Sequence, residues 1–370
     1  MKKLHFERET LLKPLQMVIG VVERKQILPI LSNVLLNNKD NTLSITGTDL
    51  EVELVGQTNV VETASEETRL TLPGRKLMDI CRALPDGAPI ELYQDKGRVI
   101  LNSGKSRFTL ASLPSEDFPN IEVQEGLFSF EISQQDLEYL LHSCSFAMAH
   151  QDVRYYLNGM LFEVDPDTIR TVATDGHRLA MATVKANIET DHRVQIIIPR
   201  KGVVELQRLL SNSSEKLQVT ISSNFIRITS KEYTFTSKLL EGKFPDYQRV
   251  IPKKSDKMVS IEKDLLKQAL QRAAILCNEK FRGLRFEFRE NLLRIFANNP
   301  EQEAAEEEIV INYSKEELDI GFNVTYLVDI LNILSTEEVS LHFSDSNTSL
   351  LVEEAHDGRD SVFVVMPMRL

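Results

Sequence analysis

The sequence repeats one pattern three times, and this internal repetition restricts the possible folds more than any other feature. Asp49 has its counterpart in Asp175, at an offset of 126, and Asp175 has its counterpart in Asn299, at an offset of 124. The same offsets relate Pro73 to Pro199 and Glu205 to Asp329. A register kept over most of a 370-residue chain predicts three repeats of about 123 residues, each long enough to be a domain. We place these domains at residues 1–125, 126–251 and 252–370.

Each repeat shows the same order of predicted secondary structure. It opens with an amphipathic helix, in which apolar side chains recur at intervals of three and four residues. These side chains are Leu137, Leu140, Leu141, Cys144 and Met148 in repeat two, Leu11, Leu12, Leu15, Val18, Ile19 and Val22 in repeat one, where Pro14 interrupts, and Leu266, Leu270, Ala273 and Cys277 in repeat three. Alternating segments at 42–48, 168–174 and 292–298 predict strands, and a second helix is predicted at 75–84, 201–210 and 324–334. Further strands follow, so the class is α+β: three repeated domains, each with two helices packed on antiparallel sheet.

Composition narrows the class of protein. No segment approaches the roughly 18 to 20 apolar residues that span a bilayer, and the N-terminus lacks the apolar core of a secretory signal, so we expect a cytoplasmic protein without membrane contact. Cys81, Cys144 and Cys277 are scattered through apolar stretches, which predicts buried small side chains rather than disulfides or metal ligands. The formal net charge of −12 argues by itself against a nucleic-acid-binding protein, which is expected to be basic.

Several segments are similar to those of a known family. They are His150–Phe162, Thr171–Leu179, Phe244–Tyr247, Asn278–Gly283, Ala297–Gln302 and Val364–Leu370. The match extends from Leu11 to the last residue, and the chain resembles the bacterial DNA sliding clamp, the β subunit of DNA polymerase III. The resemblance implies a non-catalytic processivity factor without a cofactor. Two copies would join head to tail into a ring of six similar domains, with duplex DNA passing through a hole lined by helices.

A ring would explain how an acidic protein holds DNA. DNA that is held by topology needs no tight or sequence-specific contact, so basic side chains need only line the hole. The residues that the resemblance implies as DNA-binding are Arg24, Lys25, Arg75, Lys76, His150, Gln151, Arg154, Tyr155, Tyr156, Arg200 and Lys201, with Arg82 and Arg208 as further candidates. A single lysine or arginine is more often a solvated surface charge, whereas the Arg24–Lys25 pair and the segment from Gln151 to Tyr156 favour DNA contact.

The resemblance also implies a hydrophobic cleft between the second and third repeats. In the family this cleft receives short linear motifs of the replicative polymerase α subunit, the clamp loader δ subunit, other DNA polymerases and repair proteins. The matching positions are Leu157, Thr174, Gly176, His177, Arg178, Leu179, Pro245, Arg249, Val250, Phe281, Asn323, Tyr326, Asn347, Ser349, Val364, Val365, Met366, Pro367, Met368, Arg369 and Leu370. Apolar walls and a methionine lining suit Leu and Phe anchors. Asn347 stands where the family often has valine, and Pro367 should make the final residues leave the sheet.

A head-to-tail dimer needs two complementary edges. Phe108 and Leu110 match one edge in the family, and Ile275 and Leu276 match the other. Across this interface Lys76, Lys105 and Arg107 would face Glu301, Glu303, Glu306 and Glu307. For the acidic run from Glu301 to Glu308, a solvated loop is the alternative interpretation.

Two other functions are weighed against the clamp. Asp175 with His177 suggests acid–base or metal chemistry. However, the counterparts of Asp175 are Asp49 and Asn299, which is typical of a turn residue. The sequence has no nucleophile elbow, P-loop or dinucleotide fingerprint, so we expect no enzyme and no metal. A monomeric peptide-binding scaffold would need polar edges, which the apolar residues of the predicted dimer interface contradict.

Overall fold

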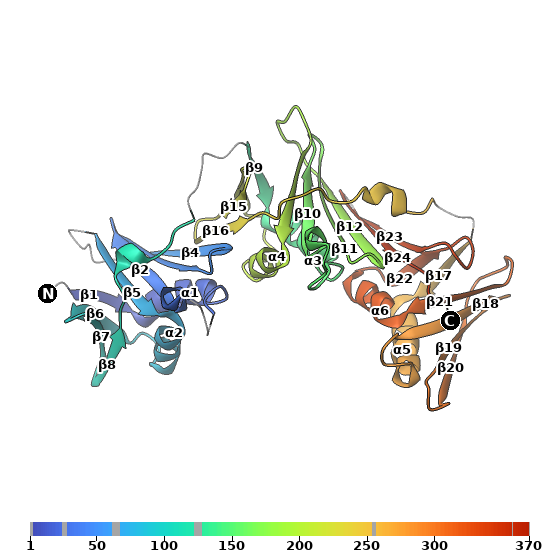
Figure 1. The fold of residues 1–370 in the computed structure, drawn as a ribbon, viewed down its shortest axis with the longest axis horizontal. Helices are drawn as coiled ribbons and strands as arrows, with labels where there is room; N and C mark the ends of the chain where they lie inside the picture. Colours follow the sequence, from blue (N-terminus) through green and yellow to red (C-terminus); the bar gives the residue numbers. More distant parts are fainter. Residues whose placement is uncertain are drawn as a thin grey trace. The chain divides into compact units, whose positions relative to one another are not determined.

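The computed structural model describes residues 3–23, 28–60, 67–121, 128–253, 257–356 and 358–369. Over these residues every repeat has the same order: strand, helix, 3-10 turn, four strands, helix and three strands (Figure 1). Repeat one contains β1 (Lys3–Glu7), α1 (Arg8–Val18), η1 (Pro29–Ser32), β2 (Asn33–Lys39), β3 (Thr42–Thr48), β4 (Val52–Asn59), β5 (Thr68–Pro73), α2 (Gly74–Ala83), β6 (Pro89–Asp95), β7 (Arg98–Ser103) and β8 (Ser106–Ala111). Repeat two contains β9 (Phe128–Ser133), α3 (Gln134–Ser145), η3 (Tyr155–Leu157), β10 (Gly159–Val164), β11 (Thr168–Thr174), β12 (Arg178–Lys185), β13 (Val194–Pro199), α4 (Arg200–Gln207), β14 (Lys216–Ile221), β15 (Phe225–Thr229) and β16 (Tyr233–Lys238).

Repeat three contains β17 (Met258–Glu262), α5 (Lys263–Ala273), η5 (Ala274–Leu276), β18 (Gly283–Arg289), β19 (Leu292–Asn298), β20 (Ala304–Val310), β21 (Leu318–Asn323), α6 (Val324–Ile333), β22 (Glu338–His342), β23 (Leu350–His356) and β24 (Arg359–Val365). Two further 3-10 turns, η2 (Ser115–Asp117) and η4 (Tyr247–Val250), follow the first and second repeats. The α+β class is therefore confirmed. The alternating segments predicted at 42–48, 168–174 and 292–298 are β3, β11 and β19, with the same bounds.

The prediction that each repeat opens with a helix is wrong. β1, β9 and β17 precede the helices without an intervening turn, and the buried Leu4 and Phe6 show the strand alternation of β1. The first helices are also shorter than the apolar pattern suggests. Ile19, Val22, Met148 and Cys277 lie beyond the helix ends, yet all four are buried. The 3-10 bond from Val22 N to Ile19 O (3.2 Å) shows why, since a tight turn continues the three-residue spacing.

α1 continues through Pro14, which lies in its second turn. Gly56 on β4 makes room for this proline, because a Cβ at Gly56 would lie 2.8 Å from Pro14 Cβ. In repeat two, Leu137, Leu140 and Cys144 of α3 are fully buried against the sheet. Thr171 Oγ1 on β11 donates to the carbonyl of Leu140 at 2.7 Å, so packing and a hydrogen bond fix α3 on its sheet together.

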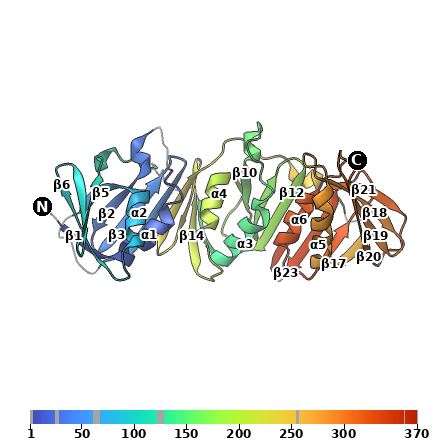
Figure 2. The ribbon, with the colours of Figure 1, turned by 90° about the horizontal axis from the view of Figure 1, so that it is seen from below.

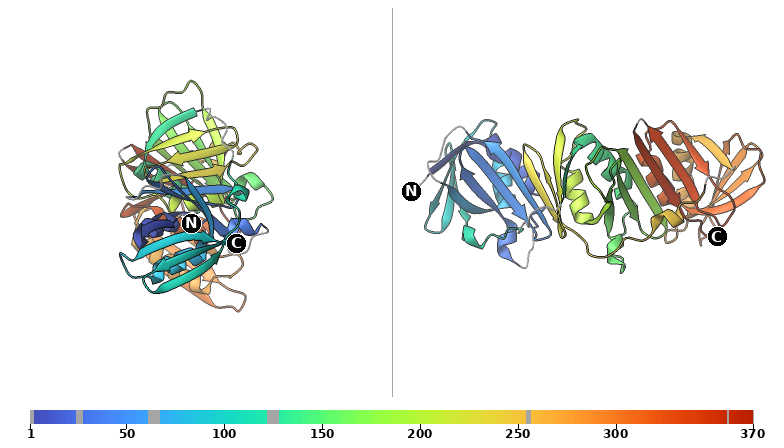
Figure 3. Two further views of the ribbon diagram at one scale, coloured as in Figure 1. Left: turned by 90° about the vertical axis from the view of Figure 1, so that its left-hand side faces the viewer. Right: turned by 90° about the horizontal axis from the view of Figure 1, so that it is seen from above.

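The chain forms two compact units, residues 1–135 with 201–239 and residues 136–200 with 240–370. The first unit has a four-stranded sheet, β1-β6-β7-β8, and an eight-stranded sheet, β5-β2-β3-β4-β16-β15-β14-β9. The second unit has an eight-stranded sheet, β13-β10-β11-β12-β24-β23-β22-β17, and a four-stranded sheet, β20-β19-β18-β21. Figure 2 shows α1 beside α2 in the first unit and α5 beside α6 in the second, and the strands face the viewer in the right panel of Figure 3.

Each eight-stranded sheet joins half of one repeat to half of the next. β4 pairs antiparallel with β16, and β12 pairs antiparallel with β24. The units therefore do not coincide with the repeats, because the second repeat contributes strands to both large sheets. The two small sheets end in β1 and β8 and in β20 and β21, and among these β8 and β20 hold the places that β16 and β24, and β4 and β12, have in the large sheets. β20 occupies most of the acidic run, so a solvated loop is the wrong interpretation for residues 304–308.

Candidate functional site

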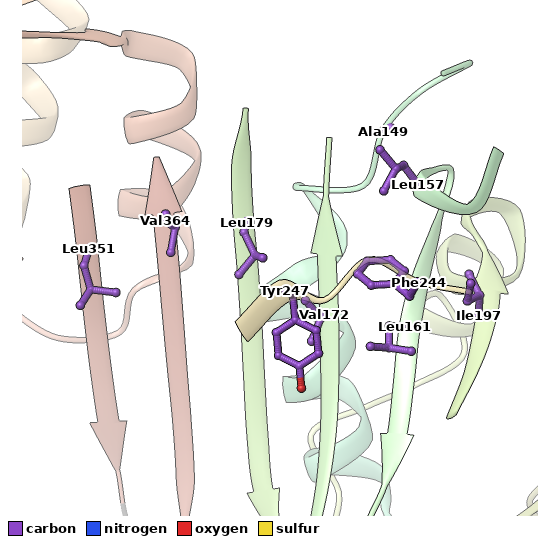
Figure 4. Close-up of a cluster of buried hydrophobic side chains, with 10 residues drawn as sticks. All are labelled: Ala149, Leu157, Leu161, Val172, Leu179, Ile197, Phe244, Tyr247, Leu351 and Val364. Carbon is purple, nitrogen blue, oxygen red and sulfur yellow. The ribbon is translucent and has the colours of Figure 1, made fainter. Parts of the chain in front are cut away.

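The second unit contains a small apolar pocket. It encloses about 160 Å³, and its lining is Arg154, Leu157, Thr174, Gly176, Arg178, Leu179, Pro245, Asp246, Tyr247, Val250, Val364 and Met366. Leu179 on β12 lies opposite Val364 on β24, so the floor of the pocket spans the pairing between repeats two and three. Figure 4 shows Leu157, Leu179 and Val364 in the cluster of buried side chains beneath it.

The turn from Thr174 to Arg178 shapes one side of the pocket. Asp175 Oδ1 accepts hydrogen bonds from His177 N (2.9 Å) and Arg178 N (3.1 Å). Asp49 makes the same turn in repeat one, where its Oδ1 accepts from the amides of Glu51 and Val52. Both aspartates therefore serve the backbone of a turn, as the sequence predicted. Gly176 suits this turn because its φ is +91°, a conformation that L side chains rarely adopt, although Leu50 takes a φ of +77° at the equivalent place in repeat one.

Arg178 fastens β12 to the third repeat beside the pocket. Its side chain is only 11% exposed, and Nε lies 3.0 Å from Asp175 Oδ2 while Nη1 lies 2.6 Å from Asp329 Oδ2 on α6. Nη2 donates to the carbonyl of Phe146 at 2.6 Å. The guanidinium also lies over the rings of Phe146 and Tyr326, 5.1 and 4.5 Å from their centroids. A largely buried charge with this many partners stabilises the packing of β12 against the third repeat and is not available to bind a ligand.

Arg154 lies at the mouth of the pocket. Its Nε and Nη2 donate to the two carboxylate oxygens of Asp152 at 3.0 and 2.9 Å, and Nη2 also reaches the carbonyl of Asp175. These hydrogen bonds lower the pKa of Asp152 to about 2. The sequence interpretation placed Arg154 among the DNA contacts, whereas the structure brings it to the pocket lining.

The opposite wall comes from the segment before repeat three. Pro245, Asp246, Tyr247 and Val250 line the pocket, and Tyr247 and Asp246 were missing from the predicted set. Both belong to the segment Phe244–Tyr247 that carried the family resemblance, so that segment was the signal that could have found them. Arg249 points away from the protein, since its side chain is 84% exposed and pairs with Asp246 at 2.8 Å.

The remaining predicted cleft residues do not line this pocket. They are His177, Arg249, Phe281, Asn323, Tyr326, Asn347, Ser349, Val365, Pro367, Met368 and Arg369, while Leu370 lies outside the described residues. Asn323 caps α6 by accepting from Thr325 N, and Asn347 lies in the turn between β22 and β23. β24 ends at Val365, as Pro367 predicted, and Met368 then pairs with Gly321 on β21. Met366, which lines the pocket, is fixed at its backbone, because Met366 N donates to the carbonyl of His177 at 2.9 Å.

The predicted DNA-contact residues differ in their solvent exposure and in the hydrogen bonds that they already make. Arg24 and Lys25 lie outside the described residues. Lys76, Arg82, His150 and Gln151 are exposed, Tyr155 is half-exposed, and Tyr156 packs against the buried cluster. Arg75 donates to the carbonyl of Val22, Arg200 to that of Met148, and Arg208 to those of Gln16 and Met17 at the end of α1.

Lys201 is held by two carboxylates of the first repeat. Its Nζ pairs with Asp49 Oδ2 and with Glu23 Oε1. Burial acts to lower the pKa of Lys201, but the hydrogen bonds to Asp49 and Glu23 outweigh burial and raise it. Lys201 therefore fastens α4 to repeat one in this structure.

The predicted interface residues lie at or beside two sheet edges, β8 and β20. On the first edge Lys105, Arg107 and the α2 residue Lys76 are exposed, Phe108 is half-buried and Leu110 is buried. On the second, Ile275 is 77% exposed, Leu276 is half-buried, and Glu303 and Glu306 are exposed. Glu307 is already paired, because Arg272 donates to both of its carboxylate oxygens at 2.8 and 2.6 Å.

Three further features of the residues that the structure describes concern metal binding, the cysteines and membrane-spanning helices. The described residues contain no cluster of three or more His, Cys, Asp or Glu side chains that could hold a metal ion. Cys81, Cys144 and Cys277 are free and buried, as predicted, and burial raises the pKa of Cys81 to about 11 and that of Cys144 to about 12. None of the helices in the described part of the chain is long and apolar enough to cross a membrane.

Three family models together match almost the whole chain. They describe the N-terminal, central and C-terminal domains of the DNA polymerase III beta subunit, and they match residues 2–122, 131–246 and 248–369.

Known proteins match over their full length. The beta sliding clamp of Pseudomonas aeruginosa is 53% identical over 369 residues, covering 99% of this chain and 100% of that protein, and the beta sliding clamp of Escherichia coli K12 is 50% identical over 368 residues, covering 100% of both. A crystal structure of a sliding clamp from Pseudomonas aeruginosa bound to griselimycin superimposes with a TM-score of 0.95 at 52% identity, covering 100% of this chain and 99% of that one.

Replacing Arg178 tests whether it stabilises the packing of β12 against the third repeat. Arg178→Ala leaves Asp329 and the carbonyl of Phe146 without their buried donor, so we expect the free energy of unfolding to fall by about 3 kcal/mol, measured by urea denaturation. Arg178→Lys should not restore it, since an ammonium group cannot reproduce the guanidinium's planar set of donors. Arg249→Ala is the control and should change stability by less than about 1 kcal/mol, because its ion pair is solvated. Equal midpoints for the Arg178 and Arg249 variants would contradict the assignment.

Proposed function

Because this chain belongs to the family of DNA polymerase III β subunits, the non-catalytic sliding clamps, we propose that two copies close into a ring that encircles duplex DNA and tethers polymerases through the apolar pocket. In this proposal residues 1–125, 126–251 and 252–370 are the three domains of each copy, and the protein works in the cytoplasm on chromosomal DNA.

The observation that carries the proposal is the pairing between repeats. Within the chain, Leu54 on β4 lies opposite Phe235 on β16, and Ala180 on β12 lies opposite Phe363 on β24. β8 and β20 occupy the equivalent places at edges of the two small sheets. A strand edge with unpaired amides and carbonyls is a template for another strand, so β8 of one copy can pair with β20 of a second copy.

The register of such a pairing follows from the two joints inside the chain. Ala304 lies opposite Asn298 across its turn, as Glu53 lies opposite Thr48 and Leu179 opposite Thr174. If β20 pairs with β8 in the register that β4 and β12 have with β16 and β24, Phe108 lies opposite the partner's Ala305 and Arg107 opposite the partner's Glu306. The same count places Lys105 opposite the partner's Glu308. Oppositely charged cross-strand pairs favour this register, and a free edge that carries charges stays soluble when the ring is open.

Head-to-tail pairing of unlike edges leaves one further pair of edges in a dimer, and two identical contacts close a ring if the rotation permits. A closed ring retains DNA without specific contacts, which agrees with a net charge of −12. We assign the DNA contacts to Arg24, Lys25, Lys76, His150, Gln151 and Tyr155. Arg75, Arg154, Tyr156, Arg200 and Lys201, also predicted from sequence, would reach DNA only by giving up part of their present contacts.

The apolar pocket is the proposed docking site for partner proteins. Its walls are largely apolar, its floor is buried, and a flexible methionine covers one side, which suits Leu and Phe side chains of a short motif. The P. aeruginosa clamp bound to griselimycin supports ligand binding in the family. The expected partners are the polymerase α subunit, the clamp loader δ subunit, and other polymerases and repair proteins.

The topological mechanism predicts how DNA is retained. After loading by a clamp loader, the protein should stay on circular plasmid DNA during gel filtration and be lost when one restriction cut linearises the plasmid. A combined Arg24, Lys25 and Gln151 alanine variant should load less efficiently with unchanged affinity for partner peptides, since the described lining of the pocket contains none of these three residues. Retention on linear DNA with free ends would contradict encirclement.

The dimer register is tested by exchanging charges. Arg107→Glu and Glu306→Arg each place like charges opposite one another at both contacts, so each should raise the dimer dissociation constant at least tenfold, about 1.4 kcal/mol, in sedimentation experiments. A mixture of the two variants should dimerise again, because one contact then has the native pair and the other the exchanged pair. Glu290→Arg, at an exposed turn, is the control. Failure of the mixture to recover would show that another register is used.

Removing the chain end tests the pocket. Deletion of residues 366–370 removes the side chain of Met366 and the pairing of Met368, so the affinity for a fluorescent peptide with Leu and Phe anchors should fall at least tenfold. The dimer mass should not change. A truncated protein that binds the peptide as tightly as the full chain would exclude this pocket as the docking site.

A further inference from the structure

The segment that forms one wall of the pocket also covers the sheet. We call residues 240–251 the strap. Phe244 and Tyr247 point from the strap into the buried cluster formed with Leu161 and Val172, as Figure 4 shows. Pro245, Asp246 and Val250 of the same strap line the pocket. The position of the wall therefore depends on how firmly the strap is attached.

The backbone contributes little to this attachment. Among the described residues, one backbone hydrogen bond ties the strap to the sheet, from Leu240 N to the carbonyl of Ile197 (2.9 Å), and it lies at the start of the strap. The pocket-lining part is separated from this bond by several residues. Segments with few backbone bonds open locally at low cost unless side chains hold them.

The side chain that holds the strap by polar contacts is Tyr247. Its Oη donates to Glu163 Oε1 at 3.2 Å and accepts from Arg170 Nη1 at 3.2 Å. Burial, above all, raises the pKa of the Tyr247 phenol, so it stays protonated and can donate at neutral pH.

Glu163 is a rigid acceptor for this hydroxyl. Its side chain is 0% exposed, Arg170 Nη1 on β11 donates to Oε1 at 2.6 Å, and Gln195 Nε2 on β13 donates to Oε2 at 2.6 Å. Arg193 lies 3.6 Å from Oε2. The carboxylate is therefore fixed by three neighbouring strands, β13, β10 and β11, and the strap is attached to that fixed point.

The first repeat lacks this attachment at the corresponding place. The offset of 126 relates Tyr247 to Ile121, Glu163 to Asn37 and Arg170 to Ser44. The backbone amide of Ile121 instead donates to Glu53 Oε2 at 3.2 Å. Glu53 is the counterpart of Leu179. The first joint therefore has a carboxylate at the position where the second joint has an apolar pocket floor. The hydroxyl–carboxylate anchor thus occurs at the joint that has the pocket.

We propose that Glu163, acting through the hydroxyl of Tyr247, is a positioning residue that holds the strap as a preformed wall of the pocket before any partner arrives, an inference that rests on the peptide-docking role proposed above. The ligand that benefits is an extended peptide with apolar anchors. Without the anchor such a peptide would have to order the wall as it binds, and its apparent affinity would fall by the fraction of time the wall is displaced.

The test removes one hydroxyl. Tyr247→Phe keeps the ring in the cluster, so the melting temperature should fall by no more than about 4 °C, and the dimer mass should stay unchanged. Amide hydrogen exchange of residues 240–251 in the ligand-free protein should rise about fivefold to tenfold, and the affinity for a peptide with Leu and Phe anchors should fall by a similar factor. Tyr233→Phe is the matched control, because Tyr233 is 4% exposed and its hydroxyl has no hydrogen-bond partner among the described residues. It should change neither quantity.

A second pair of variants separates positioning from general stability. Glu163→Gln keeps an oxygen acceptor for Tyr247 and should restore much of the strap protection that Glu163→Leu loses. If Glu163→Leu does not fold, the comparison of Tyr247→Phe with Glu163→Gln still tests whether the contact between Tyr247 and Glu163 holds the strap.

Several outcomes would overturn the proposal. Unchanged exchange in Tyr247→Phe would show that the hydroxyl does not hold the strap. Faster strap exchange with unchanged affinity would show that the anchor does not serve the pocket. Faster exchange spread over β10, β11 and β13, with a fall in melting temperature well beyond about 4 °C, would show a merely structural role. If the wild-type protein binds no such peptide, the proposed docking role is wrong. Amide hydrogen exchange of the ligand-free protein then still tests whether the Tyr247 hydroxyl holds the strap.

Discussion

Antiparallel backbone pairing between repeats is the constraint on which the rest of the structure depends. A half-sheet of four strands ends in edge strands with unpaired amides and carbonyls. The chain joins two pairs of such edges by continuing one repeat's sheet into the next, β4 with β16 and β12 with β24. The same construction necessarily leaves β8 and β20 unpaired within one chain. β8 and β20 hold the same places in their repeats as the strands already joined, and this equivalence is the reason for the proposed pairing between two copies.

The two joints share their backbone and differ in their side chains, and that difference creates the site. Asp49 and Asp175 form the same turn, but Asp49 also receives Lys201 while Asp175 also receives Arg178. At the next strand position the first joint has the buried Glu53 and the second has Leu179. Burial raises the pKa of Glu53, which reflects the unfavourable environment of its charge and is partly offset by the amide of Ile121. An apolar ligand finds a complementary floor only where leucine replaces this carboxylate.

The sequence predicted most of the fold because the relevant signals are local. Alternation placed β3, β11 and β19 at their observed bounds, and repetition placed the six helices of the described residues. It did not predict β1, β9 and β17, which are short and run directly into helices, or the sheets that cross repeat boundaries, since period-two alternation does not say which strand lies beside which. For the site, the family resemblance supplied nine of the pocket-lining residues. It did not include Tyr247 and Asp246, because their place in the pocket depends on where a connecting segment lies over a sheet far away in sequence, and the DNA contact predicted for Arg154 stays a prediction.

Several basic side chains at the joints, like the strands there, are paired within the chain. An arginine or lysine that lies near DNA can contribute to retention only if its charge is not already neutralised, and many basic residues at the joints are committed to internal partners: Arg178 to Asp329, Lys201 to Asp49 and Arg208 to the end of α1. Releasing them would break the contacts between repeats, which costs more than a screened phosphate contact returns. In the proposed ring these cations serve the joints between repeats, so the retention of DNA is assigned to closure of the ring rather than to them. Under this proposal, weak contact with DNA follows from how the repeats are held together, and weak contact would allow a closed ring to move along the duplex.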